Sequence, residues 1–360
     1  MKKIKTCLIG FCILTIGCHS RNQNTNTALG LKDYYKEFFT MGVAVSPRSL
    51  KDSSKFITEQ HFRSVTAENI MKMGPIHPKE DSFSWRYADE LIDFAKERNL
   101  KVRGHALCWH NQTPEWFFVD DEGKDVSREV LLSRLETHIT EVVTRYKDDV
   151  YAWDVVNEAI SDDENEFYRN SKFYQIIGED FIPKAFEYAR NADPEAILFY
   201  NDYSVVNPIK RKKIYELIRK MKTNGVPIDG IGIQAHWSIY QPTATIIQET
   251  IDQFENLNID IQITELDVSV YENSPRREKR EDEIDDFTDQ MRKMQIEKYD
   301  TIFQVFRKNK DKISGVTFWN VSDKYSWLDN FPVKGRKNYP LLFDEKFQPK
   351  EAYYKVIFFN

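Results

Sequence analysis

Two glutamates stand where apolar stretches of the chain end, and together they have the chemistry to cleave a glycosidic bond. Glu158 lies near the end of the run Val150–Ala159, and Glu265 lies in the run Asp260–Ser269. Glycoside hydrolysis needs one carboxyl group that donates a proton to the leaving oxygen and a second, ionised carboxylate that attacks or stabilises the anomeric carbon. The two groups must therefore occupy different environments.

The neighbours of the two glutamates predict which carboxyl does which task. Glu158 ends an apolar strand that contains Trp153, a setting that favours the neutral acid and hence an acid/base role. Residues two apart share one face of a strand, so Glu265 shares its face with Asp267. His236, from another run, can hydrogen-bond Glu265 while Asp267 holds its imidazole, which favours an ionised nucleophile.

Polar or aromatic residues stand at the ends of seven of the eight apolar runs, which predicts one cleft lined with carboxylates, amides and indoles. Alternation puts Asp154, Val156 and Glu158 on one strand face. Alternation alone does not put Asn157 on that face, but curvature at the strand end can bring it in beside Glu158. Amides such as Asn157 and Gln234 can bind sugar hydroxyls, and indole faces can stack on sugar rings. The other predicted members of the cleft are Glu68, Asn69, His105, Trp109, His110, Asn201, Asp202, Trp237, Trp319 and Asn320.

These residues also have simpler explanations. A lone glutamate in a buried strand is often half of a core ion pair, but buried charges are costly, and two such glutamates with polar neighbours favour a functional site. His105, His110 and His236 lack the close spacing of metal ligands, and carboxyl chemistry suffices, so we expect neither a metal nor an organic cofactor. Cys108 is expected to be a packed core residue, and no GxSxG motif indicates a nucleophilic serine.

Short apolar runs rich in Val, Ile and aromatic residues recur along the chain and predict buried parallel strands. Between them, apolar residues three and four apart predict helices, and Asn207-Pro208 and Asn224-Gly225 are typical of a helix start and a helix end. The predicted strands are Met41–Val45, Ser64–Asn69, Lys101–Trp109, Val150–Ala159, Ile197–Asp202, Gly230–Trp237, Asp260–Ser269 and Ile313–Asp323. The predicted helices include Tyr87–Arg98, Val130–Tyr146, Phe173–Asn191 and Pro208–Thr223.

Eight strands that alternate with helices predict an α/β fold, a single (β/α)8 TIM barrel, whose active site would form at the carboxyl ends of the strands. An open, doubly wound sheet is the competing fold, and it is disfavoured because no Gly-rich phosphate loop follows the first run. No change in composition divides the chain into two domains. The highly charged stretch 275–293 is expected to form the solvated face of a helix, with a linker as the alternative.

Composition disfavours several classes of protein. The 360 residues include 51 Lys and Arg against 57 Asp and Glu, a net charge of −6, and nucleic-acid binders instead need basic surfaces that neutralise phosphates. Gly and Pro number 13 each, too few for a fibrous or linker-rich chain. We expect no nucleic-acid partner, and a monomer is the default oligomeric state.

The N-terminal segment has the pattern of an export signal. Three lysines in the first five residues precede an apolar run over residues 7–16 that is too short to span a bilayer, and Gly17-Cys18 follows. This pattern is similar to that of a bacterial lipoprotein signal, in which the cysteine after the cleavage point becomes lipidated. A plain secretory signal and an uncleaved anchor are the alternatives.

We therefore expect a signal peptide over residues 1–17, a flexible tether over 18–30 and a catalytic domain over 31–360. Membrane contact would be made only through lipid on Cys18. The expected location is the periplasm or the outer membrane, with secretion as the alternative.

Motifs along almost the whole chain after the N-terminal segment resemble those of glycoside hydrolase family 10, the endo-β-1,4-xylanases. The pair WDVVNEA (Trp153–Ala159) and ITELDV (Ile263–Val268), in this order, is highly specific. Further similar motifs are TAENIMK (Thr66–Lys72), RGHALCWHNQTPEW (Arg103–Trp116), FYNDY (Phe199–Tyr203), GIGIQAHW (Gly230–Trp237), GVTFWNVSDKYSWL (Gly315–Leu328) and PLLFDEKFQPKEAYY (Pro340–Tyr354).

The resemblance implies an enzyme that cuts internal β-1,4 bonds of xylan by a retaining double displacement, with Glu158 as acid/base and Glu265 as nucleophile. The two carboxyl groups should then lie about 5–5.5 Å apart. It also implies that His236 and Asp267 orient Glu265, and that Tyr203 lines the subsites beyond the cleaved bond. The residues implied to bind the sugar before that bond are Glu68, Asn69, Lys72, His105, Trp109, Asn157, Gln234, Trp319 and Trp327.

Substrate choice has a physical interpretation, because xylose lacks the hydroxymethyl group of glucose. Trp319 and Trp327 are expected to close over the ring where that group would stand, which would exclude glucose by a clash. The chain departs mildly from the family pattern at Ala106, at Cys108 and in the charged segment 271–299, which borders the cleft. The rival functions are a cellulase or mixed-linkage glucanase, and a glycan-binding protein without turnover.

Overall fold

The structure, a computed structural model, describes residues 29–272, 276–280, 283 and 285–359. Its strands are β1 (Thr40–Val45), β2 (Ser64–Ala67), β3 (Lys101–Trp109), β4 (Val150–Asn157), β5 (Ile197–Asp202), β6 (Gly230–Ile233), β7 (His236–Ser238), β8 (Asp260–Ser269) and β9 (Ile313–Phe318). All strand pairings are parallel, in the order β1-β2-β3-β4-β5-β6-β8-β9, and β9 pairs with β1. These pairings close the predicted (β/α)8 barrel, with the short β7 paired to the end of β8.

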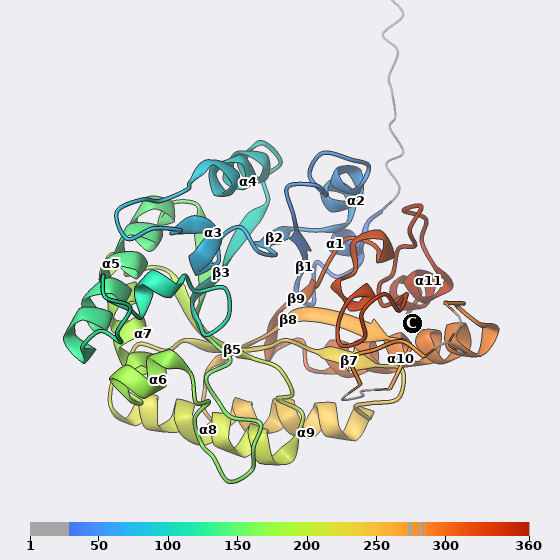
Figure 1. Ribbon diagram of the computed structural model, residues 1–360. Coiled ribbons are helices and arrows are strands. Elements are labelled where there is room, and N and C mark those ends of the chain that lie inside the picture. Colours follow the sequence, from blue (N-terminus) through green and yellow to red (C-terminus); the bar gives the residue numbers. More distant parts are fainter. Residues whose placement is uncertain (1–28, 273–275, 281–282, 284, 360) are drawn as a thin grey trace, which may run out of the picture.

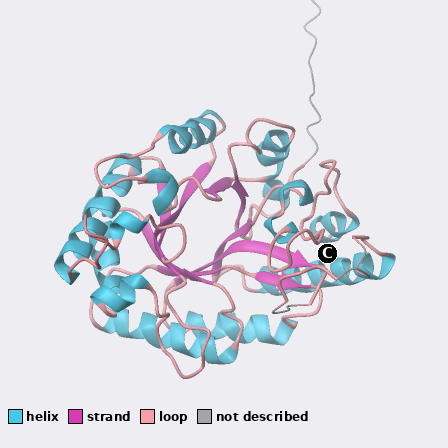
Figure 2. Ribbon diagram, viewed as in Figure 1, coloured by secondary structure: helices cyan, strands magenta, loops and turns pink. Residues whose placement is uncertain are grey.

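Helices surround the barrel as an outer layer (Figures 1 and 2). Their bounds are α1 (Leu31–Tyr34), α2 (Ser54–His61), α3 (Met73–Ile76), α4 (Arg86–Glu97), α5 (Arg128–Tyr146), α6 (Lys172–Ile177), α7 (Phe181–Ala192), α8 (Pro208–Thr223), α9 (Ala244–Glu255), α10 (Asp289–Lys308) and α11 (Glu351–Ile357). Short 3₁₀ turns lie at η1 (Glu115–Phe117), η2 (Asp323–Tyr325) and η3 (Trp327–Asp329). The hydrophobic core lies between the outer faces of the strands and the helices that cover them.

The predicted start and end of α8 are confirmed. The side chain of Asn207 accepts hydrogen bonds from the backbone N–H groups of Ile209 and Lys210, and Pro208 occupies the first turn, where its missing N–H costs nothing. Gly225 follows the last turn with a φ of 74°, a conformation that glycine adopts without strain. The first turn of α8 is therefore fixed close to the end of β5.

Two predicted elements are divided in the structure. The helix predicted over Phe173–Asn191 is two helices, α6 and α7, because Gly178 has a φ of 82° and ends the first of them. The strand predicted over Gly230–Trp237 is β6 and β7, because Ala235 has a φ of 63° and turns the backbone between them. That turn leaves Gln234 directly after β6 and His236 at the start of β7, which pairs with β8.

The charged stretch 275–293 was predicted to be a helix face, and that prediction is wrong for its described N-terminal part. The helix α10 begins only at Asp289, after Thr288, whose hydroxyl accepts a hydrogen bond from the backbone of the first turn. Before it, described residues are held in a loop by ion pairs. Glu283, for example, accepts a bidentate pair from Arg276 and a contact from Arg336.

A buried charged layer inside the barrel lies among the strands below the carboxyl ends. The guanidinium of Arg103 contacts Asp154 at 2.5 Å, and both side chains are 1% exposed. His105 meets the other oxygen of Asp154 through its Nδ1 atom at 2.9 Å. Because a buried charge is costly without a partner, this layer fixes the positions of β3 and β4 relative to each other.

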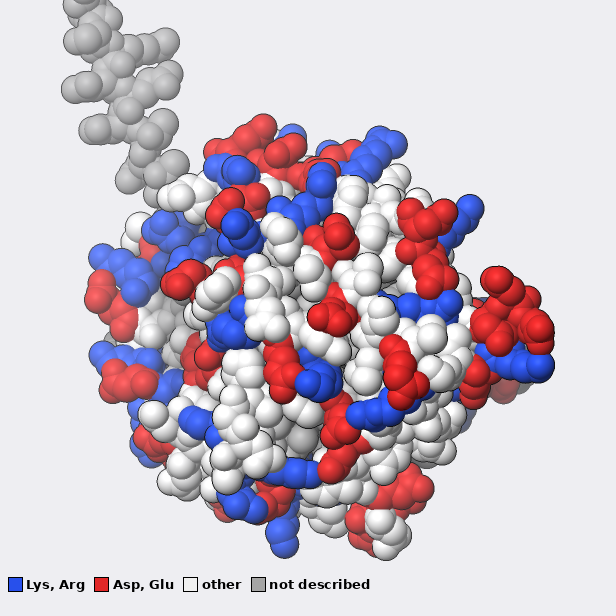
Figure 3. All heavy atoms as spheres, turned by 90° about the vertical axis from the view of Figure 1, so that its left-hand side faces the viewer, with Lys and Arg blue, Asp and Glu red and all other residues white. Residues whose placement is uncertain are grey.

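The surface over α5 and α7 mixes charges of both signs. Lys and Arg side chains alternate with Asp and Glu side chains on this face, which is the left side of Figure 1 turned toward the viewer (Figure 3). This face therefore presents no continuous cationic surface of the kind that binds a phosphate backbone.

The predicted signal peptide, lipidated Cys18 and most of the tether lie outside the described residues. Among the residues that the structure does describe, no helix combines the length and the apolar character needed to cross a bilayer.

Candidate active site

The carboxyl ends of the strands bring the two predicted catalytic glutamates into one polar network. The carboxylate of Glu158, directly after β4, accepts hydrogen bonds from Trp109 Nε1 at 2.9 Å and from Gln234 Nε2 at 3.0 Å. The carboxylate of Glu265, in β8, accepts one from Asn201 Nδ2 at 2.8 Å. Glu265 is 4% exposed, whereas Glu158 is only partly buried.

Amide side chains connect the two carboxyl groups. The side-chain oxygen of Asn157 accepts hydrogen bonds from Asn201 at 2.9 Å and from Gln234 at 3.1 Å. The same Asn201 amide also donates to Glu265, and the same Gln234 amide also donates to Glu158. All three amides are almost fully buried, so the network fixes both carboxyl groups relative to each other.

The alternation predicted along β4 is wrong at its end. The register shifts between Asp154 and Val156, so Asn157 rather than Val156 joins the amide network. Glu158 follows with a φ of 60°, a left-handed conformation that is unfavourable for a residue with a Cβ atom. A bulge and a left-handed residue, rather than gentle curvature, therefore bring Asn157 and Glu158 to the same cleft.

His236 lies between Glu265 and Asp267, as the strand pattern predicts. Its Nε2 atom is 3.2 Å from Glu265 Oε2, and its Nδ1 atom is 3.0 Å from Asp267 Oδ2. Burial alone would lower the pKa of His236, but Asp267 and Glu265 raise it to about 10. The imidazole is therefore protonated at neutral pH, and it donates one N–H to each carboxylate.

Positive charge around Glu265 keeps this carboxyl group ionised. Its burial would raise the pKa, yet the pKa lies below the usual range because His105, His236 and Lys72 oppose burial more strongly. An anionic carboxylate held by hydrogen bonds at the end of a strand is suited to nucleophilic attack.

The segment after β2 contributes three more polar side chains to the cleft, Glu68, Asn69 and Lys72. Lys72 Nζ donates to Asn69 Oδ1 at 3.0 Å and lies 4.6 Å from the centre of the Trp109 ring. Burial lowers the pKa of Lys72 and raises the pKa of Glu68, although each opposes the shift of the other. Glu68 also accepts a long hydrogen bond from Asn320, which the resemblance did not include. These groups can bind sugar hydroxyls.

Two indoles lie against His236. Trp319 lies edge-on to it, with ring centres 6.3 Å apart, and Trp327 lies closer, at 4.9 Å. The N–H of Trp327 donates to Asp267 Oδ2 at 2.8 Å, so this indole is tied to the carboxylate that holds His236. Trp319 also packs edge-on against His105, at 5.2 Å.

The charged loop before α10 supports Trp327 from outside. Phe331 stacks on Trp327, with ring centres 5.2 Å apart, and the guanidinium of Arg277 lies 5.2 Å from the centre of the Phe331 ring. A groove of about 670 Å³ runs between the loop and the segment around Phe331. The charged segment thus borders the cleft through the contact of Arg277 with Phe331, which in turn stacks on Trp327.

Six of the residues predicted to bind substrate lie at or just beyond strand ends, and they are Glu68, Asn69, Trp109, Asn157, Gln234 and Trp319. Lys72 directly precedes α3, His105 lies within β3, and Trp327 lies in η3. Asn201 and Asn320 were recognised only as polar strand ends, and the structure shows that Asn201 directly contacts Glu265. Tyr203 follows β5, and its hydroxyl contacts Arg169 at 2.6 Å. Within the described residues, no three His, Cys, Asp or Glu side chains are grouped as metal ligands would be.

A (β/α)8 barrel that holds two carboxyl groups and a set of amides and indoles at its carboxyl end is the architecture of a glycoside hydrolase. Comparison with known proteins identifies the family. The model of glycosyl hydrolase family 10 matches residues 30–358, so the chain belongs to that family.

Relatives and solved structures match over nearly the whole chain. "Endo-1,4-beta-xylanase B" of Paenibacillus barcinonensis is 46% identical over 323 residues, which cover 90% of this chain and 96% of the relative. The crystal structure of xylanase XynB from the same organism, in complex with a conduramine derivative, has a TM-score of 0.89 at 45% identity and covers 92% of this chain and 99% of its own. A mutant structure in complex with xylotriose has a TM-score of 0.88 at 43% identity and covers 92% and 100%.

The protonated His236 predicts a loss of stability at alkaline pH. The folded protein keeps this proton up to a pKa of about 10, whereas the unfolded chain releases it near 6.5. The stabilisation is therefore complete below pH 6.5 or so and is lost as the pH rises toward 10. We expect the difference in free energy of unfolding between the protein and its His236→Gln variant to shrink over this range.

Denaturant unfolding at several pH values measures that difference. His61→Gln is the matched control, because burial lowers the pKa of His61 to about 4 and its titration affects stability only below the same range. A difference for His236→Gln that stays constant from pH 6.5 to 10 would show that His236 is not held protonated.

Proposed function

We propose that the protein is an endo-β-1,4-xylanase that hydrolyses internal bonds of xylan. Its family, its relatives named as xylanases and the xylotriose in a solved structure of similar fold support this substrate. The observation that carries the chemistry is the amide network that joins Glu158 and Glu265. Two carboxyl groups with different surroundings at one cleft are what glycoside hydrolysis requires.

The proposed reaction is a double displacement with retention. The carboxylate of Glu265 attacks the anomeric carbon and forms an ester bond, while the bond to the leaving sugar breaks and its oxygen takes the proton of Glu158. Glu158, now a carboxylate, removes a proton from water, whose oxygen attacks the same carbon and releases Glu265. The carboxyl separation that this mechanism needs is about 5–5.5 Å, too short for a water molecule between nucleophile and sugar.

The surrounding residues have separate tasks in this proposal. His236, held by Asp267, keeps Glu265 ionised and correctly turned. The Asn157 amide is proposed to bind the sugar hydroxyl next to the anomeric carbon, a bond that strengthens in the transition state. The other substrate-binding residues hold the hydroxyl groups and faces of the sugars before the cleaved bond, and they are Glu68, Asn69, Lys72, His105, Trp109, Gln234, Trp319 and Trp327.

Trp319 and Trp327 are proposed to set the preference for xylose. Both indoles lie beside His236, next to the nucleophile, and Phe331 restrains Trp327 from behind. A restrained indole cannot swing away to admit the hydroxymethyl group of glucose, so discrimination arises from steric exclusion.

We expect release of reducing ends from xylan to exceed release from carboxymethylcellulose by about tenfold or more, because a clash in a rigid pocket is costly. In Trp327→Ala, the ratio of the two rates should fall. A reducing-sugar assay on both polymers at equal enzyme concentration measures the ratio. A parent enzyme that prefers the glucan would instead favour a cellulase or mixed-linkage glucanase.

Replacement of the nucleophile should abolish turnover without unfolding the protein. We expect Glu265→Ala to lower kcat by about 10³-fold or more, because the covalent step is lost. Glu216→Ala, at a partly exposed position of α8, is the matched control and should keep full activity. If the parent releases no reducing sugar yet binds xylan as tightly as Glu265→Ala, the protein is a glycan-binding protein and the proposal fails.

We also propose that the protein is exported and tethered through lipid on Cys18, because a basic start, a short apolar run and Gly17-Cys18 precede the tether. In cells that express the full chain and are supplied with labelled palmitate, we expect the protein to incorporate the label. Cys18→Ser should lose the label and leave the membrane fraction, whereas Cys108→Ser, a change at a buried free thiol, should keep both. Equal labelling of both variants would contradict lipidation at Cys18.

A further inference from the structure

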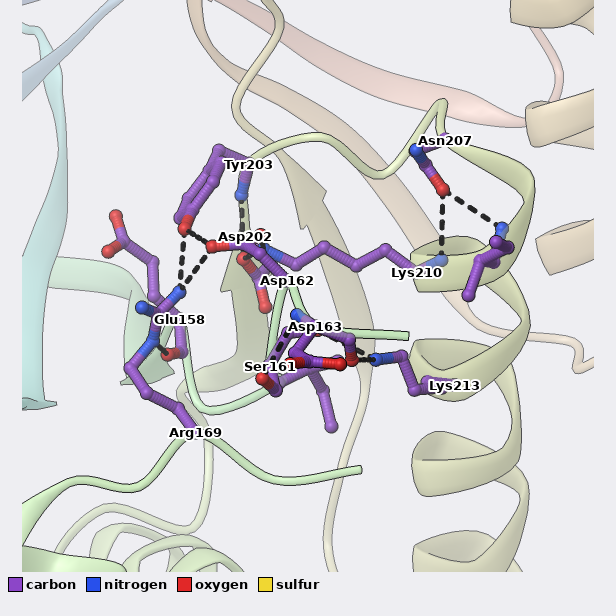
Figure 4. Close-up of polar contacts among 12 residues, drawn as sticks. Glu158, Ser161, Asp162, Asp163, Arg169, Asp202, Tyr203, Asn207, Lys210 and Lys213 are labelled. Carbon is purple, nitrogen blue, oxygen red and sulfur yellow. Dashed lines mark hydrogen bonds and ion pairs between the residues drawn. The ribbon is translucent and has the colours of Figure 1, made fainter. Parts of the chain in front are cut away.

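The backbone around Glu158 has an unusual conformation that needs external support. Its φ of 60° is unfavourable for glutamate, and the chain leaves β4 at this point. The N–H of Glu158 donates to the carbonyl of Asn201 at 2.9 Å. Its carbonyl accepts from Arg169 Nε at 2.8 Å, and Figure 4 shows Arg169 beside Glu158 and Tyr203. The direction of the Glu158 carboxyl group therefore depends on contacts from other elements.

Tyr200 supplies the support for the next two residues. Its hydroxyl oxygen accepts hydrogen bonds from the backbone N–H groups of Ala159 at 3.0 Å and of Ile160 at 3.1 Å. A hydroxyl has two acceptor positions and one proton, so both acceptor positions are taken. The proton is donated to Asp202 Oδ2 at 2.6 Å. Tyr200 and Asp202 are fully buried, so solvent cannot replace any of these bonds.

Lys210 holds Asp202 in turn. Its Nζ atom lies 2.9 Å from Asp202 Oδ1 and 2.8 Å from Asp162 in the loop after β4. Figure 4 shows the Lys210 side chain extending from α8 toward Asp202 and Asp162. Burial raises the pKa of Asp202 to about 6 although Lys210 opposes the rise, so the carboxylate is available as an acceptor at neutral pH. Burial and Asp202 raise the pKa of Tyr200, which keeps its proton.

The same helix also holds the loop that follows Glu158. Lys213 Nζ donates to the backbone carbonyls of Ser161 at 2.8 Å and Asp163 at 2.7 Å (Figure 4). The capped first turn of α8 thus fixes the loop and the buried carboxylate together. None of these side chains donates directly to the carboxyl group of Glu158.

We propose that Tyr200 and Asp202, held by Lys210, are positioning residues that aim the carboxyl group of Glu158 at the leaving oxygen. Loss of the Tyr200 hydroxyl leaves two buried N–H groups without a partner, and the left-handed turn at Glu158 relaxes. The carboxyl group then moves from its place beside Trp109 and Gln234, and proton transfer is slow from a misplaced acid. This inference rests on the proposed acid/base role of Glu158.

The leaving group separates this role from a merely structural one. Departure of a sugar needs protonation, whereas an activated phenol such as 2,4-dinitrophenol leaves without it. A misplaced Glu158 should therefore slow cleavage of xylobiosides with a poor leaving group much more than cleavage of the activated aryl xylobioside. General loss of folded enzyme should slow both to the same extent.

The test compares kcat/KM on the two substrates for three variants. Glu158→Ala is the reference, with a loss of about 10²–10⁴-fold on the poor leaving group and little loss on the activated one. For Tyr200→Phe we expect a loss of about tenfold on the poor leaving group and less than about threefold on the activated one. Tyr146→Phe is the matched control, because it removes another buried hydroxyl that donates to a carboxylate, Asp89, far from the site, and it should change neither rate.

Asp202→Asn provides a second test. The substitution replaces the charged acceptor of the Tyr200 proton with a neutral side chain of nearly the same size. We expect the same dependence on the leaving group as for Tyr200→Phe. Equal losses on both substrates, or no loss on either, in a folded Tyr200→Phe or Asp202→Asn protein would overturn the inference. If Glu158→Ala itself shows no dependence on the leaving group, the proposed acid/base role fails and the inference fails with it.

Discussion

The hydrogen bonds among Asn157, Asn201 and Gln234 are the constraint on which the site depends. They join Glu158, directly after β4, to Glu265 on β8 through side chains that solvent does not reach. Backbone hydrogen bonds between neighbouring strands hold the strands of a closed barrel at fixed distances. The three amides extend from these strands, and their hydrogen bonds hold the two carboxyl groups at fixed positions relative to each other. The strands of the closed barrel therefore position the two carboxyl groups directly, in addition to supporting the loops.

The two carboxyl groups differ because their surroundings differ. Glu265 is buried, and His105, His236 and Lys72 hold its pKa below the usual range, while Asp267 keeps His236 protonated. Glu158 is partly exposed, and the groups that donate to it are a neutral indole and neutral amides. A nucleophile must stay ionised while the acid/base changes its charge twice in each turnover, so a cationic environment around one and neutral donors around the other suit these two tasks.

Much of this arrangement could be predicted from the sequence because parallel strands end at one face of a barrel. The type and position of polar residues at those ends were enough to place Glu265, His236 and Asp267 together. The bulge in β4 and the left-handed turn at Glu158 could not be predicted, because a periodic pattern carries no information on where the period breaks. Trp327 came only from the family resemblance, since strand alternation does not position a residue beyond the strand.

Local composition was least informative where long-range pairing decides the structure. The charged stretch before α10 has a helical composition, but Glu283 is paired with Arg336, more than fifty residues away, and the described residues of the stretch before α10 are not helical. The role of Tyr200 was likewise hidden, because an aromatic residue in a buried strand is usually a core residue, and only the structure shows its hydroxyl bonded to the chain after Glu158.

The stereochemistry of the product tests most directly whether the two carboxyl groups act on one bond as nucleophile and acid/base. Proton NMR of xylohexaose hydrolysis, recorded before mutarotation is significant, identifies the anomer that forms first. The account predicts that the new reducing ends appear as the β anomer and convert slowly to the α anomer. New reducing ends that appear first as the α anomer would contradict it, because inversion requires a water molecule between Glu265 and the sugar.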